Sequence, residues 1–170
     1  MTLADLNPMT PAEFTTTLGA IYEHAAWVAA GAASARPFAT VSDLHASMAE
    51  IVDAAPHEKQ FALVAGHPDL GGKLARAGQL EAASAVEQAG LGLDRLSNEE
   101  FEAFDSMNAA YRTKFGFPFV IAVKRHTRAS VLEAFKNRLQ NDAETELTAA
   151  LAEVHMIARF RLDALFSPVA

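Results

Sequence analysis

Three groups of side chains in this 170-residue chain have residue types and spacing suited to chemistry. The first is His67, which precedes Pro68 and the turn Asp69–Gly72 at the end of an expected helix over 57–66. Because proline disfavours the α conformation at the preceding residue, this helix should end near His67. Imidazole exchanges protons near neutral pH, so His67 is a candidate general acid or base. A histidine that merely complements the dipole of a helix C-terminus is the other interpretation.

The second group is Ser84, Glu87 and Gln88, which share one face of a helix expected over 74–89. Side chains three and four residues apart are neighbours on a helix, so these three could bind a polar, ring-shaped ligand. A solvated surface stripe is an equally simple interpretation. A capping box from Ser84 to Glu87 is a third, although such a helix would meet Gly90 after little more than one turn.

The third group is Arg159 and Arg161, near the end of a helix expected over 143–166. Two residues apart, they cannot share a helix face, so one could enter a pocket while the other meets solvent. The chain carries 21 acidic and 14 basic residues, a net charge of −7. Because the overall field repels anions, an anionic substrate would need a local cation. Complementing the helix dipole is the more ordinary role of such arginines.

The sequence disfavours several other kinds of site and partner. The segment Gly66–Lys73 is not a phosphate loop, because its lysine stands one residue too late and Leu74 replaces the required Ser or Thr. The histidines lack zinc-ligand spacing and the chain has no cysteine, so we expect no metal site. Net acidity argues against nucleic acid, and no uncharged apolar run of about 18 residues predicts a membrane span. Residues 1–10 do not resemble a signal peptide, so a cytoplasmic protein is expected.

Helical patterns run along nearly the whole chain. Capping boxes are expected at Thr10–Glu13 and Ser97–Glu100, Ser42 is expected to cap a helix that Pro56 closes, and Thr127 to open one that runs to about 140. We therefore predict a single all-α domain over residues 1–170, a helical bundle of about seven to nine helices.

Residues 117–123 (Phe-Pro-Phe-Val-Ile-Ala-Val) are the exception, because this apolar run has no helical signature. An extended apolar segment inside a helical domain could be the wall of a pocket. A buried crossover between helices fits the same pattern equally well.

Together these residues resemble one family, the 2-oxo-4-hydroxy-4-carboxy-5-ureidoimidazoline (OHCU) decarboxylases. The resemblance covers essentially the whole chain and keeps the order and spacing of several motifs: His67-Pro68-Asp69-Leu70, Gly72-Lys73-Leu74-Ala75, Ser84 with Glu87-Gln88-Ala89-Gly90-Leu91, Asn108-Ala109-Ala110-Tyr111, Lys114-Phe115-Gly116-Phe117-Pro118-Phe119-Val120-Ile121, Glu153-Val154 and Ile157-Ala158 with Arg161-Leu162.

The resemblance implies an all-helical homodimer that decarboxylates OHCU to (S)-allantoin in urate degradation, as a carboxy-lyase without a cofactor. It implies that His67 and Glu87 are catalytic. It also implies that seven residues bind the small-molecule substrate: Pro68, Ser84, Gln88, Phe119, Val120, Ile121 and Arg161. Arg161, and not Arg159, is in register with the family pattern Ile-Ala-x-x-Arg-Leu.

Two rival functions fit a chain of this kind. One is a non-catalytic helical module that binds a purine breakdown product or a partner protein, which the loss of His67 or Glu87 would favour. Both residues are present. The other is an enzyme of the same fold that acts on another ring or opens a ring by hydrolysis.

Overall fold

The computed structural model describes residues 1–167, and residues 168–170 lie outside that part. The described chain divides into two compact units, Met1–Leu63 with the chain from His155 onward, and Val64–Val154. Every regular element in the described residues is helical, which confirms the predicted all-α class. The single domain expected over residues 1–170 stays a prediction.

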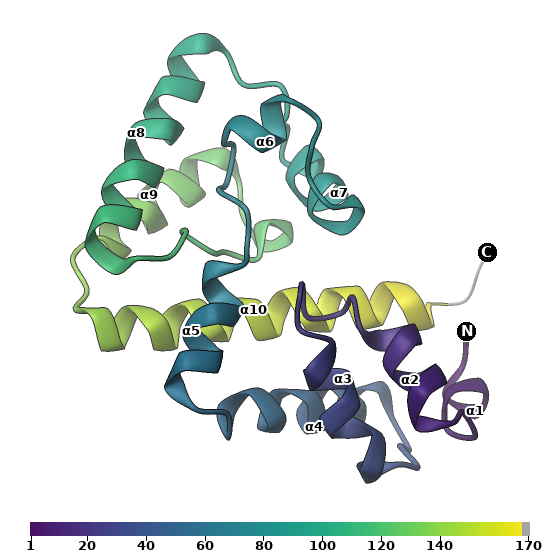
Figure 1. Cartoon of the computed structure of the whole chain (residues 1–170). Coiled ribbons are helices and arrows are strands. Elements are labelled where there is room, and N and C mark those ends of the chain that lie inside the picture. The colour runs from purple at the N-terminus through teal and green to yellow at the C-terminus, as the bar shows by residue number, and fades with distance from the viewer. Residues whose placement is uncertain (168–170) are drawn as a thin grey trace. The chain divides into compact units, whose positions relative to one another are not determined.

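Three of the helices of the first unit, drawn in Figure 1, begin with a capping box. Thr10 and Glu13 form the predicted capping box of α2. Thr40, not Ser42 as predicted, caps α4, because its hydroxyl accepts the N–H of Asp43 while the Asp43 carboxylate accepts the N–H of Thr40. The helices of this unit are α1 (Leu3–Leu6), α2 (Pro11–Leu18), α3 (Ala26–Ala32), η1 (Ala33–Ala35) and α4 (Val41–Asp53).

Helix α3 packs against both α2 and α4, and this contact forms the core of the first unit. The side chains that fill it are fully buried: Phe14, Leu18, Val28, Leu44, Met48 and Val52. Removing such apolar surface from water is the main source of stability for a fold of this size.

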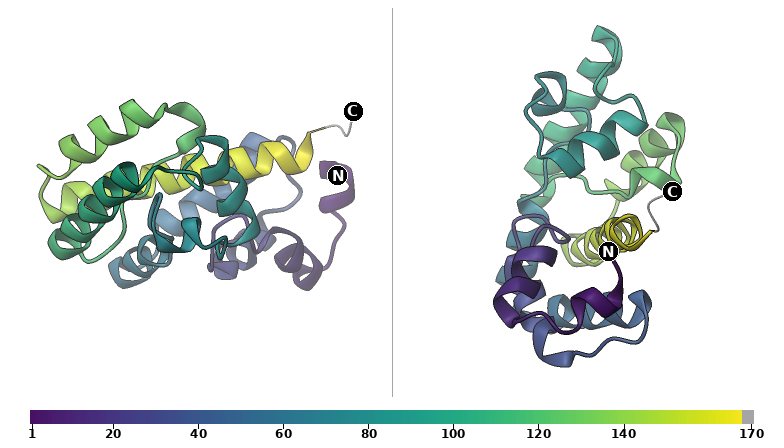
Figure 2. Two further views of the ribbon diagram at one scale, coloured as in Figure 1. Left: turned by 90° about the horizontal axis from the view of Figure 1, so that it is seen from above. Right: turned by 90° about the vertical axis from the view of Figure 1, so that its right-hand side faces the viewer.

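The second unit contains α6 (Lys73–Arg76), α7 (Ala82–Gly90), α8 (Asn98–Phe115), η2 (Val123–Arg125) and α9 (Arg128–Arg138). Two further helices, α5 (His57–Ala65) and α10 (Ala143–Phe166), have residues in both units. Figures 1 and 2 show α8 and α9 running alongside each other. The rings of Phe104 and Tyr111 on α8 meet Phe135 on α9 at centroid distances of 6.5 and 5.7 Å.

The helix expected over 74–89 is interrupted, and α6 and α7 take its place. Gly78 adopts a φ of 66°, its N–H donates to the carbonyl of Ala75, and the N–H of Gln79 donates to the carbonyl of Leu74. This pair of bonds around a left-handed glycine is a Schellman motif, which ends a helix. The described residues hold ten α-helices, and the four-residue α1 and α6 account for the excess over the expected count of about seven to nine.

The other predicted elements are where the pattern put them. Helix α5 ends two residues before His67, Ser97 and Glu100 form the capping box of α8, and Thr127 caps α9. In the described part of the chain, no helix is both long and apolar enough to cross a membrane.

Candidate active site

His67 lies in the loop between α5 and α6, and it is only 6% exposed. Its N–H donates to the carbonyl of Val64, so the loop leaves α5 through a tight turn. Gln88 of α7 binds this loop with both the oxygen and the nitrogen of its side-chain amide. The N–H of Gly71 donates to Oε1 of Gln88 at 2.9 Å, and Nε2 of Gln88 donates to the carbonyl of Asp69 at 3.3 Å. Gln88, which is predicted to bind the substrate, therefore also fixes the loop that carries the predicted catalytic residue His67.

Helix α8 holds the same loop from a second direction. Nδ2 of Asn108 donates to the carbonyl of Leu70 at 3.0 Å, and Nε of Arg112 donates to Oδ1 of Asp69 at 2.7 Å. Asn108 is buried, and its Oδ1 has no hydrogen-bond partner among residues 1–167. A buried acceptor left in this way is available to a ligand or to water.

Gly71 is required at the centre of this loop for two reasons. Its φ of 59° is left-handed, where side chains are strained. A Cβ at this position would also stand 2.9 Å from Leu96 and 3.3 Å from the ring of Phe104. The turn at position 71 therefore favours glycine both by its backbone conformation and by the space available.

Helix α7 carries the predicted polar cluster. It begins at Ala82 with Glu81 as the N-cap residue, so the interpretation of Ser84 and Glu87 as a capping box is wrong. Ser84 and Gln88 are 4% and 5% exposed, and Glu87 is half-buried. A solvated stripe would not be so buried, so that interpretation is wrong for Ser84 and Gln88.

The segment 117–122 contains neither helix nor strand, and its residues are buried. The N–H of Ala122 donates to Oε2 of Glu153 at 2.8 Å. By contrast, the backbone N–H groups of Phe119, Val120 and Ile121 make no hydrogen bond to any residue from 1 to 167. Buried backbone donors are nearly always paired, so three in a row constitute a candidate binding surface for oxygen atoms of a ligand.

Two observations link α7 to the other predicted residues of its unit. Gln88 is bonded to the His67 loop, and α7 packs against η2, which directly follows the segment 117–122. The loop, α7 and η2 are therefore parts of one assembly (Figure 1). In residues 1–167 no group of three or more His, Asp and Glu side chains could hold a metal ion.

Arg161 belongs to the other unit. Its Nη2 donates to Oε2 of Glu23 at 3.2 Å, and the side chains of Arg161 and Glu23 are 8% and 6% exposed. Arg159 differs, because its side chain is 34% exposed and pairs with Asp163 on the same helix. The two arginines thus differ in exposure as predicted, and the role of Arg161 in substrate binding stays a prediction.

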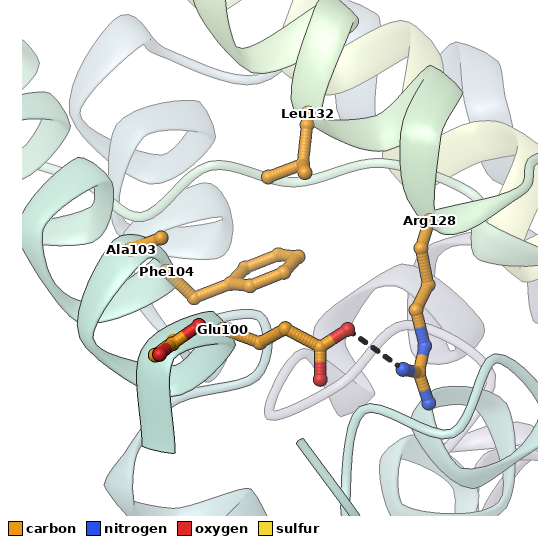
Figure 3. A pocket seen from close by; sticks show the side chains of 6 residues that line it. Glu100, Ala103, Phe104, Arg128 and Leu132 are labelled. Carbon is orange, nitrogen blue, oxygen red and sulfur yellow. Dashed lines mark hydrogen bonds and ion pairs between the residues drawn. The ribbon is translucent and has the colours of Figure 1, made fainter. Parts of the chain in front are cut away.

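A pocket of about 270 Å³ opens between α8 and α9, and none of the predicted site residues lines it (Figure 3). Phe104, Ala103 and Leu132 supply its apolar wall, and Glu100 pairs with Arg128 at 3.1 Å on one side. The Phe104 ring also lies beside Gly71, because a Cβ built on Gly71 would stand 3.3 Å from it.

The sequence assigned no role to four residues that the structure connects to the predicted site. Glu23 is bonded to Arg161, and Arg138 to Val120. Glu146 is bonded to Arg138, and Asn108 to the loop that carries His67. In the motif Asn108-Ala109-Ala110-Tyr111, the spacing of three residues places Asn108 and Tyr111 on one helix face, and this spacing could have indicated a role for Asn108. The partnership of Arg138 with Glu146 joins two helices, so no local pattern could reveal it.

Comparison with known proteins identifies the family. A family model described as OHCU decarboxylase matches residues 7–163. A 2-oxo-4-hydroxy-4-carboxy-5-ureidoimidazoline decarboxylase of Haloferax volcanii is 41% identical over 167 residues, which cover 98% of this chain and 97% of that protein. The chain belongs to the OHCU decarboxylase family.

Longer relatives contain a similar region. The uric acid degradation bifunctional protein PucL of Bacillus subtilis is 44% identical over 95% of this chain, which spans only 32% of that protein. A crystal structure of (S)-allantoin synthase superposes with a TM-score of 0.77 at 34% identity, covering 96% of this chain and 54% of that one. The OHCU decarboxylase fold is thus found both as a chain of this length and inside longer ones.

Proposed function

We propose that this chain catalyses the decarboxylation of OHCU to (S)-allantoin, with proton transfer by His67 and Glu87 and without a cofactor. The observation that carries the proposal is family membership over residues 7–163, with relatives of nearly the same length that are named for this reaction. The geometry supports it, because Gln88 joins the His67 loop to α7 and α7 packs against η2.

The substrate explains how the reaction can proceed on side chains alone. Its carboxylate sits on a ring carbon that bears a hydroxyl and adjoins a C=N bond. When the bond to the carboxylate breaks, CO₂ leaves and the electron pair moves into the C=N group, whose nitrogen gains a proton. An enol results. The enzyme must therefore orient the anionic substrate, and it must then remove the hydroxyl proton of the neutral enol and deliver one proton to a single face of the adjacent carbon.

His67 and Glu87 are proposed to carry out these last two transfers between them. His67 is buried in its loop. Glu87 lies on α7 directly before Gln88, the residue that binds the same loop. A base and an acid supplied by different elements can reach opposite sides of a planar enol. Protonation from one side alone gives a single enantiomer.

The remaining predicted residues are proposed to bind the substrate. The unpaired N–H groups of Phe119, Val120 and Ile121 would donate to carbonyl oxygens of the ureido group or ring, while Ser84, Gln88 and Pro68 complete the pocket. The family resemblance also assigns Arg161 to the substrate, and an arginine in that role should bind the carboxylate loosely. Tight binding of the group that leaves would stabilise the ground state and oppose the reaction.

The deciding experiment generates the unstable substrate in situ from urate and follows CO₂ release together with circular dichroism. We expect faster CO₂ release and a growing signal of one enantiomer, whereas the uncatalysed reaction gives racemic allantoin. A non-catalytic binding module would leave both the rate and the racemic outcome unchanged. The homodimer and the cytoplasmic location stay predictions.

A further inference from the structure

We infer that Arg138 and Glu146 are positioning residues that hold the segment 119–121 in its binding shape, an inference that rests on the proposed function. Arg138 ends α9 and Glu146 lies in α10. Nε of Arg138 donates to Oε1 of Glu146 at 2.8 Å, and Nη1 donates to the carbonyl of Val120 at 2.7 Å. One guanidinium thus connects a buried carboxylate to the middle of the segment.

The carboxylate of Glu146 is itself fixed in place. Its side chain is fully buried, and it accepts the hydroxyl of Tyr111 on Oε1 and Nδ2 of Asn141 on Oε2, the latter at 2.8 Å. Burying two charges is costly, and well-packed apolar side chains often give equal stability. What apolar side chains cannot supply is direction. The guanidinium, held by Glu146, presents Nη1 to one carbonyl oxygen in a fixed orientation.

Other contacts hold Phe119, at the start of the segment, and Ala122, the residue that follows it. Cζ of Arg138 lies 4.7 Å from the ring centroid of Phe119, and that ring stacks on Phe135 at 3.8 Å. Beyond the segment, the carboxylate of Glu153 accepts the N–H of Ala122. With these points fixed, the peptide planes between them are fixed as well. The three N–H groups of residues 119–121 are then preorganised for a ligand at little cost in entropy.

The first test separates positioning from simple stabilisation. Arg138→Lys keeps a positive charge beside Glu146, but a single ammonium cannot hold the carboxylate and the Val120 carbonyl in the same geometry. We expect KM to rise about 10- to 100-fold, the effect of losing one hydrogen bond to a charged group, with a smaller change in kcat. Val131→Ala is the matched control, because Val131 is fully buried on the same helix and has no part in the pair. It should lower Tm at unchanged KM.

The second test removes both charges. Arg138→Met with Glu146→Gln leaves no unpaired buried charge and keeps an oxygen to accept the Tyr111 hydroxyl. We expect this double variant to fold and to show at least the KM of Arg138→Lys. If it does not fold, Arg138→Lys alone decides the matter.

A readout without substrate distinguishes failure of this inference from failure of the proposed function. In ¹⁵N-labelled protein, the amide of Ala122, which donates to Glu153, should exchange with solvent faster in Arg138→Lys than in Val131→Ala or the parent. If the parent does not decarboxylate OHCU, the proposed function is wrong, and amide exchange still decides whether Arg138 positions the segment. Unchanged KM in Arg138→Lys, or amide exchange no faster than in Val131→Ala, would overturn the inference.

Discussion

The guanidinium of Arg161 donates to the carboxylate of Glu23 at 3.2 Å, and more than nine-tenths of each side chain is buried. Nη1 of Arg161 also approaches the carbonyl of Ile21 at 3.4 Å. The guanidinium is therefore oriented by the chain before any ligand arrives. Because a carboxylate already shares its charge, the proposed binding of a substrate anion to Arg161 should have only moderate strength, which suits a group that leaves as CO₂.

This pairing determines how the role of Arg161 is tested. Arg161→Met alone would take the guanidinium away from the buried carboxylate of Glu23 and cost roughly 3–5 kcal/mol of stability. Combined with Glu23→Gln, it should fold and still lose about 1.5–3 kcal/mol in kcat/KM, the contribution of a charged hydrogen bond. Arg159→Ala is the control, since its partner Asp163 is exposed. Equal losses in kcat/KM at positions 159 and 161, measured by steady-state kinetics, would refute the assignment of the binding role to Arg161.

Conservative changes at His67 and Glu87 test proton transfer. His67→Asn and Glu87→Gln should each lower kcat by about 10²–10⁴-fold with little effect on ligand affinity. The double variant should lose far less than the product, because groups acting together are not additive. His57→Asn and Glu81→Gln, both exposed, are matched controls. Chiral analysis of the product gives a second readout, and optically pure allantoin at full rate from either single variant would show that the wrong residues were chosen.

Gly71 and Gly78 offer a matched pair for the loop. Both have positive φ, but a Cβ at Gly78 would meet nothing within 4 Å, whereas a Cβ at Gly71 would meet Leu96 and Phe104. Gly78→Ala should cost about 1–3 kcal/mol from strain alone. Gly71→Ala should cost more and should also lower kcat/KM, because it displaces the N–H bonded to Gln88. Thermal unfolding and kinetics on both variants check this, and equal effects would argue against the steric explanation.

Independence from cofactors is a direct consequence of the proposed chemistry. Since the C=N group of the substrate accepts the electron pair, activity should survive exhaustive chelation and dialysis. The measurement is the rate of CO₂ release before and after treatment. Recovery only after addition of a metal ion or pyridoxal phosphate would contradict the cofactor-free mechanism.

Acid should weaken the helix starts. Hydrogen bonds from Thr10 hold the pKa of Glu13 below its ordinary value of 4.5, and those from Ser97 and Arg128 do the same for Glu100. A carboxyl whose pKa is lower in the folded state stabilises above its unfolded pKa and loses that contribution as pH falls through the folded value. When Tm is measured from pH 7 to pH 3, it should therefore decrease once the pH is lower than about 4.5. The decrease should be smaller in Glu13→Gln. An unchanged slope in Glu13→Gln would exclude this cause.

Local signals predicted much of the fold. Capping boxes and apolar spacing located α2, α5, α8, α9 and α10, because each depends on residues within one or two turns. The break at Gly78 was missed, since alanine-rich flanks hid the Schellman turn.

In the candidate site, too, local spacing predicted some features, while contacts between distant parts of the chain could not be predicted. Ser84 and Gln88 could be placed on one inward face from their spacing, but the bond from Gly71 to Gln88 crosses 17 residues of sequence and depends on packing. The pairing of Arg161 with Glu23 spans 138 residues, so spacing predicted an inward arginine but not its partner.

The run 117–123 has a consequence for handling the protein. Its Phe, Val and Ile residues have high β propensity, and in the native chain they are buried without pairing in a sheet. Once unfolded, such a stretch can pair with the same stretch of another molecule. Pro118 within it and Lys124–Arg125 after it occupy the positions where proline and charge suppress aggregation. Heating past Tm should therefore be least reversible in variants that neutralise Lys124 and Arg125.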